Sequence, residues 1–126
     1  MQFRTFLLLT GLLALVFGVA FALAPAPVLA LYAVTTDVGG LVMSRFFGAA
    51  LINLGLVLLL VRGVADPKAQ GAIALGSCVG SIAGLVVALT AQLNGVVNAV
   101  GWSSVAIYLL LALGYGYFRF APPRTA

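Results

Sequence analysis

The sequence contains no histidine, no glutamate and a single cysteine, and only eight of its 126 residues are charged. Soluble domains average about 25% charged residues, whereas 6% of this chain is charged and 64% is hydrophobic. This composition excludes an ordinary soluble domain and predicts a protein embedded in lipid. The same scarcity of polar groups leaves little material for chemistry.

The missing residue types also limit the function classes. Without histidine, the chain lacks the usual ligand of haem, and neither a zinc site nor a di-iron centre has the ligands it needs. Proton relays through membranes generally use Asp, Glu or His, and the only two carboxylates, Asp37 and Asp66, lie outside the apolar runs. No serine, cysteine or lysine has a base beside it for nucleophilic catalysis. We therefore expect no enzyme activity, no metal and no cofactor, and the absence of a basic cluster argues against nucleic acid.

Four apolar runs are each long enough to cross a bilayer as a helix, which takes about 20 residues. The sequence does not show the alternation of polar and apolar residues that is typical of membrane-spanning strands. Backbone groups in lipid must be hydrogen-bonded within the spanning element, and a helix does this by itself. The sequence therefore predicts an all-α, integral membrane four-helix bundle, a single transmembrane domain over residues 1–126. The expected helices cover about 5–24, 39–61, 67–93 and 96–118, with a segment on the outer membrane surface at about 25–37.

Basic residues at the ends of the runs predict the orientation. Arg4, Arg62, Lys68, Arg119 and Arg124 fall on one side if the four helices alternate in direction. By the positive-inside rule that side is the cytoplasm. We expect both termini in the cytoplasm, a bacterial inner membrane as the location, and membrane lipids as neighbours. The first run exceeds the 7 to 15 or so residues of a secretory signal's apolar region, so we expect a retained helix.

Local signals mark the connections. Asp66 and Pro67 suit the cap and first position of the third helix, because aspartate accepts from free amides and proline lacks an N–H. This short link predicts a tight antiparallel hairpin of the second and third spans. Asn94 and Gly95 predict another turn, since glycine tolerates the left-handed conformation that ends a helix. Asn98 lies beyond that turn, where water can satisfy its amide. Residues 25–37 are too apolar for a solvated loop; their alternative role is to dock a partner subunit.

Small residues recur at intervals of four along the third span. Lipid gives helices no hydrophobic reason to associate, so close approach over small residues and interhelical hydrogen bonds must supply the attraction. Three interpretations remain: packing within the same bundle, contact with another subunit, and a groove for a ligand or lipid. Cys78, inside this span, is expected to be a small buried or lipid-facing residue. The expected packing residues are Ala72, Gly76, Gly80, Gly84 and Ala88, with Ser77 and Ser81 beside them.

Two polar side chains interrupt the second span. About 24 Å of helix separates Arg45 from Arg62, less than the hydrocarbon thickness of about 30 Å, so one arginine must reach to the headgroups. The expected partner of Arg45 is a lipid phosphate or the Asp37 carboxylate, and the alternative is a functional anion or substrate site. Asn53, near the middle of the span, requires a hydrogen-bond partner. It is expected to join helices or, alternatively, to form a polar step on a transport path.

One run resembles a known group of proteins. Arg45–Ala49 (RFFGA), followed by Gly55, is similar to the start of the second helix in small uncharacterised bacterial four-helix integral membrane proteins. The resemblance covers about 20 residues and implies a fold and topology without an activity. Small fluoride channels also have four spans, but this chain lacks the Thr- and Phe-rich break of their third helix. Small multidrug transporters use a first-helix glutamate that has no counterpart here.

The sequence leaves three functional hypotheses. The first is a non-catalytic accessory or structural subunit that packs against a larger membrane complex or against copies of itself. The second is a small oligomeric channel or carrier for an anion or polar solute, using Arg45 and Asn53. The third is a binder of a hydrophobic molecule such as a quinone, a carotenoid or a lipid, in a groove lined by Tyr108, Tyr115 and Tyr117.

Overall fold

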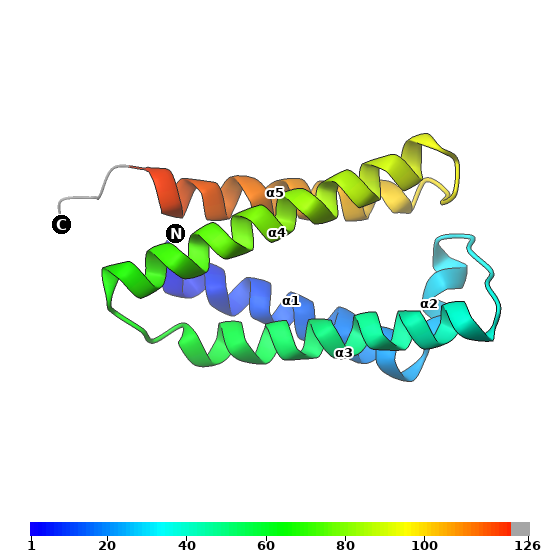
Figure 1. The fold of residues 1–126 in the computed structure, drawn as a ribbon, viewed down its shortest axis with the longest axis horizontal. Coiled ribbons are helices and arrows are strands. Elements are labelled where there is room, and N and C mark those ends of the chain that lie inside the picture. Colours follow the sequence, from blue (N-terminus) through cyan, green and yellow to red (C-terminus); the bar gives the residue numbers. More distant parts are fainter. Residues whose placement is uncertain (122–126) are drawn as a thin grey trace. The chain divides into compact units, whose positions relative to one another are not determined.

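A computed structural model describes residues 1–121, which form five helices and no strand (Figure 1). Four of the helices are long and apolar enough to cross a membrane. The all-α prediction is therefore confirmed. The chain divides into two compact units, the first made of Met1–Gly63 with Val97–Ala99 and the second containing the last two helices. The helices are α1 (Phe3–Leu23), α2 (Pro25–Leu31), α3 (Val38–Val61), α4 (Pro67–Leu93) and α5 (Gly101–Phe120).

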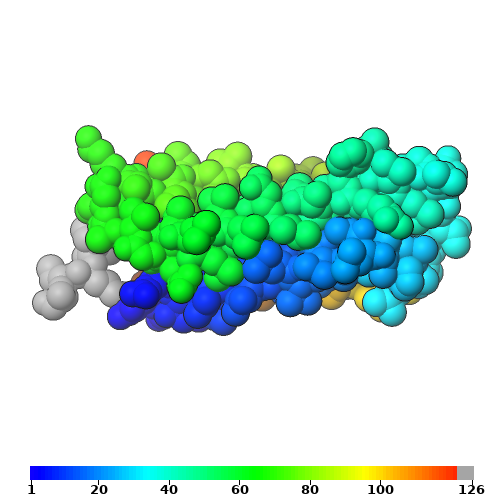
Figure 2. Space-filling model, turned by 90° about the horizontal axis from the view of Figure 1, so that it is seen from below, coloured from blue at the N-terminus to red at the C-terminus, as the bar shows by residue number. Residues whose placement is uncertain are grey.

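Glycines hold α1 and α3 in close contact in the first unit. Gly18 lies against Gly48, and Gly11 lies against Gly55. A Cβ atom added at Gly48 would stand 2.6 Å from the Gly18 carbonyl oxygen, and one added at Gly55 would stand 2.7 Å from that of Gly11. Figure 2 shows the α1 atoms, in blue, directly against those of α3, in cyan to green. Because seven residues make about two turns, each helix presents its two glycines on one face.

Larger apolar side chains complete this contact. The rings of Phe21 and Phe47 meet edge to face, with centroids 5.1 Å apart. Leu7 and Leu58 are 1% and 4% exposed. Other large apolar side chains point outward, and Leu60 is 81% exposed. The core of this unit is thus a narrow strip between two helices whose outer surface is itself apolar, and both helices are long and apolar enough to cross a membrane.

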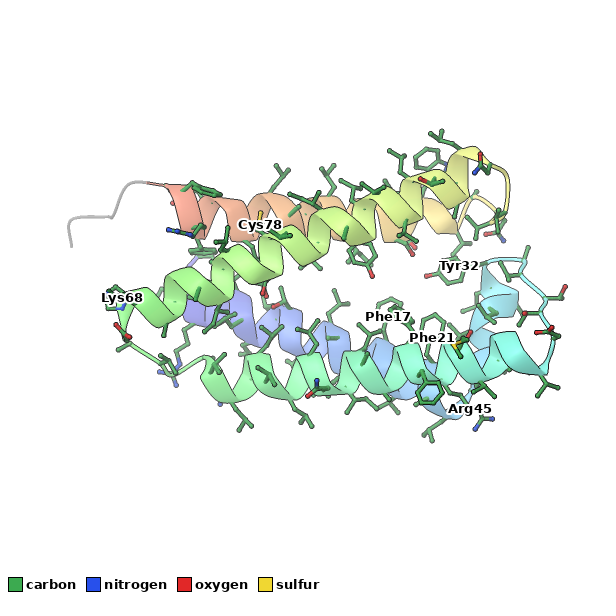
Figure 3. The ribbon with its side chains drawn as sticks, in the orientation of Figure 1. Phe17, Phe21, Tyr32, Arg45, Lys68 and Cys78 are labelled. Atoms are coloured by element: carbon green, nitrogen blue, oxygen red, sulfur yellow. The ribbon has the colours of Figure 1, made fainter. Side chains whose placement is uncertain are left out.

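In the second unit, α4 packs on α5 through a row of small residues. Ala74, Cys78 and Ser81 are buried at helical spacing on α4. The Cys78 sulfur lies 3.5 Å from the carbonyl oxygen of Ala112, and Figure 3 shows this side chain between the two helices. The ring of Tyr108 occupies the space that Gly84 leaves, because a Cβ atom there would stand 2.5 Å from the tyrosine Cδ1. The single thiol is therefore a buried packing residue.

The start of α4 follows the predicted capping. The Asp66 carboxylate accepts a hydrogen bond of 3.2 Å from the backbone N–H of Lys68, and Pro67 occupies the first helical position. The cap prediction is confirmed. The predicted hairpin concerns α3 and α4, which belong to different units, and it stays a prediction.

The fourth long helix begins later than the sequence analysis predicts, at Gly101 instead of about residue 96. Gly95 adopts the left-handed conformation with φ +70°, as its turn signal predicts. The next N–H, that of Val96, donates to the carbonyl of Ala91 at 3.0 Å and closes the end of α4. Val97–Ala99 then belongs to the first unit. Residues 96–100, which the sequence predicts as helix, therefore form the connection between α4 and α5. The apolar segment after α1 also gains structure, since Pro25–Leu31 is helical.

Gly48→Ala is expected to destabilise the protein by about 1–3 kcal/mol, because the added methyl group would collide with α1 backbone that has no side-chain freedom to give way. Gly76→Ala makes the same substitution on α4, where no atom lies within 4 Å of the new Cβ, and is the matched control. Thermal unfolding of both variants in mild detergent measures the difference. Equal midpoints would show that the α1–α3 contact is looser than described.

Candidate functional site

The carboxyl end of α2 is closed by a left-handed alanine. Ala33 has φ 57°, a conformation that residues other than glycine rarely adopt. Its N–H donates to the carbonyl of Ala30 at 3.0 Å, and the N–H of Val34 donates to that of Leu29, also at 3.0 Å. These two bonds form a Schellman motif. They satisfy two of the four carbonyl groups that every helix leaves without an internal partner.

Asn98 satisfies the other two carbonyls. Its backbone N–H donates to the carbonyl of Tyr32 and its side-chain Nδ2 donates to that of Leu31, both at 3.1 Å. The end of α2 therefore has a protein donor for each of its last carbonyl groups. We expected water to satisfy the Asn98 amide, and its role at the end of α2 was not predicted. The available signal was an apolar segment whose helix end needs donors, together with an amide in another connection predicted on the same side of the membrane.

Asp37 caps α3, and it does not pair with Arg45. Its carboxylate Oδ1 accepts a hydrogen bond of 2.9 Å from the backbone N–H of Gly40. Arg45 lies eight residues further on, about 12 Å along the helix. It is exposed, and Figure 3 shows its side chain projecting outward from α3. Within residues 1–121 the guanidinium makes no ion pair or hydrogen bond. We expected Arg45 to bind either a lipid phosphate or the Asp37 carboxylate. The carboxylate binds the backbone N–H of Gly40 instead.

Asn53 is exposed on the side of α3 that faces away from α1. It stands five residues from Gly48 and therefore about 140° around the helix from the glycine contact. Its amide has no hydrogen-bond partner among residues 1–121. Asn53 and Arg45 are separated by about 12 Å along α3 and by about 80° around it. The structure therefore does not bring these two predicted residues together into one polar site.

The predicted packing residues of α4 lie on two different sides of the helix. Gly76 and Gly80 each stand two residues from Cys78, which places them about 160° around the helix from this α5-facing residue. No atom lies within 4 Å of a Cβ added at either glycine. The exposed members are Ala72, Gly76 and Gly80, the partly buried ones are Ser77, Gly84 and Ala88, and the buried one is Ser81.

The exposed surface of α4 has two parts with different shapes. One part, the small face, consists of Ala72, Gly76, Gly80 and Ala83, all exposed and none larger than alanine. Val87, which is 69% exposed, lies on the same side of the helix one turn beyond Ala83. The other part, the bulky face, carries side chains that are 39–59% exposed, and it consists of Leu75, Val79, Ile82 and Val86. The small face leaves helix backbone accessible, whereas the bulky face covers it.

The three tyrosines proposed to line a groove have separate surroundings. Tyr108 fills the space at Gly84. Tyr115 is 2% exposed, and Tyr117 is 45% exposed. The Tyr117 ring meets that of its neighbour Phe118, with centroids 5.2 Å apart. Two of the three rings are thus occupied by packing within the protein.

Comparisons of the chain with protein-family models, curated proteins and solved structures found no match. The resemblance of Arg45–Ala49 to small bacterial four-helix membrane proteins therefore stays a prediction. Among the described residues, no group of three or more His, Cys, Asp or Glu side chains could hold a metal ion. The candidates for function are the small face of α4, the Asn53 side of α3 and the exposed Arg45, whose role as an anion or headgroup site stays a prediction.

Asp37→Ala is expected to lower stability by about 1 kcal/mol, because it removes the side-chain acceptor from the first turn of α3. Asp37→Asn keeps an acceptor oxygen and should stay close to the wild type. Thermal unfolding in mild detergent distinguishes capping from an ionic role. If Asp37→Asn lost as much stability as Asp37→Ala, the carboxylate charge would matter and the capping explanation would be wrong.

Asn98→Ala is expected to weaken the end of α2, since the Leu31 carbonyl loses its protein donor. We expect amide hydrogen exchange in Pro25–Tyr32 to speed up about 2- to 10-fold, the equivalent of a net hydrogen bond worth about 0.5–1.5 kcal/mol. Asn94→Ala is the control, because the Asn94 side chain has no hydrogen-bond partner within residues 1–121. Identical exchange in both variants would argue against this role of Asn98.

Proposed function

We propose that this protein is a non-catalytic membrane subunit that packs, through the small face of α4, against a neighbouring membrane protein. Each of its four long helices crosses a bacterial inner membrane, the helices form a bundle, and both termini lie in the cytoplasm. The distribution of basic residues supports the orientation, since Arg4, Arg62, Lys68 and Arg119 all flank helix ends on one side of an alternating topology. Arg124, which also supports it, lies outside the described residues.

The observation that carries this proposal is a contrast among the glycines of the long helices. At Gly11, Gly18, Gly48 and Gly55 an added Cβ would come within about 3 Å of the facing helix, and at Gly84 it would meet the Tyr108 ring. At these five glycines another group approaches closely, whereas at Gly71 and Gly116 the nearest atom would lie 3.9 and 3.6 Å from the added Cβ, an ordinary contact. Gly76 and Gly80 have the same residue type and no neighbour within 4 Å.

Membrane physics gives a reason to expect a protein neighbour at these two glycines. Lipid chains solvate leucine and valine as well as another helix does, so side chains of that size give little attraction between helices. Small residues separated by three others let two backbones approach and gain dispersion contacts along their length. The bulky face of α4 provides ordinary lipid-facing surface, while the small face offers the close approach. The surface of α4 therefore agrees better with a packing role than with a path for a solute or a groove lined by aromatic rings.

Gly80→Leu is expected to remove the proteins that co-purify with the chain, because a leucine side chain would hold the partner helix away from the α4 backbone. The measurement is extraction from native membranes in mild detergent, followed by mass spectrometry of the whole eluate. A loss of at least 10-fold in the associated mass, relative to the chain itself, is expected.

Val79→Leu changes a neighbouring residue on the bulky face and should leave the associated mass unchanged. The thermal midpoint of purified Gly80→Leu should match the wild type, since nothing lies within 4 Å of the new Cβ. The proposal would be refuted by a wild-type chain that elutes alone as a monomer, or by a Gly80→Leu chain that keeps every associated mass.

A further inference from the structure

The last turn of α5 places an arginine over the start of α4. In the second unit, Nη1 of Arg119 would stand 3.9 Å from a Cβ atom added at Gly71, so the guanidinium reaches a side of α4 that carries no side chain of its own. The guanidinium carbon also lies 5.6 Å from the centroid of the Phe120 ring. Figure 1 shows the end of α5 and the start of α4 at the same end of this helix pair. A cation from α5 is thereby held on the surface of α4.

Lys68 provides a second cation on the same part of α4. It lies in the first turn of the helix (Figure 3), it is exposed, and it precedes Gly71 by three residues. Residues at this spacing are neighbours on a helix surface, with Cβ atoms about 5–6 Å apart. The amino end of α4 therefore presents two cations on adjoining parts of its surface, one from its own first turn and one from α5.

Both acidic side chains of the sequence are engaged at helix caps. The Asp66 carboxylate accepts from the backbone N–H of Lys68, and the Asp37 carboxylate accepts from that of Gly40 at the start of α3. The sequence contains no other aspartate or glutamate. Within residues 1–121 neither Lys68 nor Arg119 forms an ion pair. The two cations therefore need an anion from elsewhere.

An exposed apolar stripe continues from Lys68 along α4. Leu75, Val79 and Val86 follow Lys68 at spacings that place them within about 20° of it around the helix. They are 39%, 58% and 59% exposed. Leu75 and Val79 lie about 10 and 16 Å along the helix from Lys68, which is the depth of one leaflet of a hydrocarbon core about 30 Å thick. The bulky face of α4 thus begins directly after the two cations.

This order of groups matches the chemistry of a phospholipid. Lysine and arginine bind phosphate oxygens through charge-assisted hydrogen bonds, and acyl chains pack against bulky apolar side chains. Basic pockets between membrane helices on the cytoplasmic side are known to bind lipid headgroups. A headgroup without a cation of its own adds no repulsion to the two basic side chains. An acidic protein would also neutralise them, but it would leave the apolar stripe without a role.

We propose that Lys68 and Arg119 bind the headgroup of one anionic phospholipid of the cytoplasmic leaflet, whose acyl chains lie along the bulky face of α4. The inference rests on the part of the proposed function that places α4 across the membrane with its amino end in the cytoplasm. It adds a lipid ligand to that proposal. The small face of α4 stays available for the protein neighbour.

Native mass spectrometry of the purified full chain, titrated with phosphatidylglycerol in mild detergent, measures the bound lipid. The wild type is expected to bind one phosphatidylglycerol at least about 10-fold more tightly than phosphatidylcholine, whose choline group is itself a cation. Lys68→Gln and Arg119→Gln should each lower the affinity for phosphatidylglycerol about 5-fold, the effect of one basic side chain near anionic lipid, and the double variant should lower it about 25-fold.

Arg4→Gln is the matched control and should leave the affinity unchanged. Arg4 is also an exposed cation at a helix start, without an ion pair within residues 1–121, but it belongs to the first unit. Lys68→Arg and Arg119→Lys keep the charges and should retain most of the affinity. The thermal midpoint of the double variant without lipid should match the wild type. Glycerol phosphate, which has the headgroup chemistry without acyl chains, should not displace the lipid.

Several outcomes would overturn the lipid site. These are an equal loss of affinity with Arg4→Gln, equal binding of the two lipids, no bound lipid, and displacement by glycerol phosphate. Loss of an associated protein from the double variant, with unchanged lipid affinity, would assign the cations to an acidic protein instead. The Gly80→Leu purification distinguishes such a failure from failure of the proposed function. If Gly80→Leu still removes the associated proteins, only the lipid site is wrong, and if it has no effect while lipid binding follows the prediction, only the packing role is wrong.

Discussion

The close approach of helix backbones over glycine determines how this chain is organised. With six per cent charged residues, the protein has few ion pairs or polar networks available. For helices that span a membrane, as we propose for these, the hydrophobic effect does not draw one apolar helix to another. What remains is short-range contact, which grows steeply as backbones come closer. The pairing of α1 with α3 depends on Gly18 facing Gly48 and Gly11 facing Gly55. The pairing of α4 with α5 uses a different solution, in which a tyrosine ring fills the space at Gly84.

Because polar residues are few, the polar side chains of the protein mainly bind the backbone at helix ends. Asp37 and Asp66 accept from the first amides of α3 and α4. Asn98 donates to the last carbonyls of α2. Arg62 donates to the carbonyl of Leu59 near the end of α3. Each of these groups compensates a backbone atom that helix geometry leaves unpaired. Arg45 and Asn53 are exceptions, and they lie apart from one another on α3.

The helices could be predicted from the sequence because their causes are local. Apolar length predicts the spans, Asp66 with Pro67 predicts the start of α4, and Asn94 with Gly95 predicts its end. The late start of α5 could not be predicted in this way, since it depends on Asn98 binding a segment 66 residues earlier in the chain. Which of the small residues of α4 are covered could not be predicted either. A repeat of four shows that the residues are small, but the position of α5 decides which of them are covered.

The hydrogen bonds of Asn98 also impose an order on assembly during synthesis. The ribosome releases α2 long before residue 98, and until then the carbonyls of Leu31 and Tyr32 lack their protein donor. The chain must first produce all of α4 and the turn at Gly95 before the first unit can complete its own backbone bonding. The amino-terminal half therefore reaches its final state after most of the carboxyl-terminal half exists. A nascent chain stopped between α3 and α4 would therefore contain α1, α2 and α3 but leave the end of α2 without these two donors.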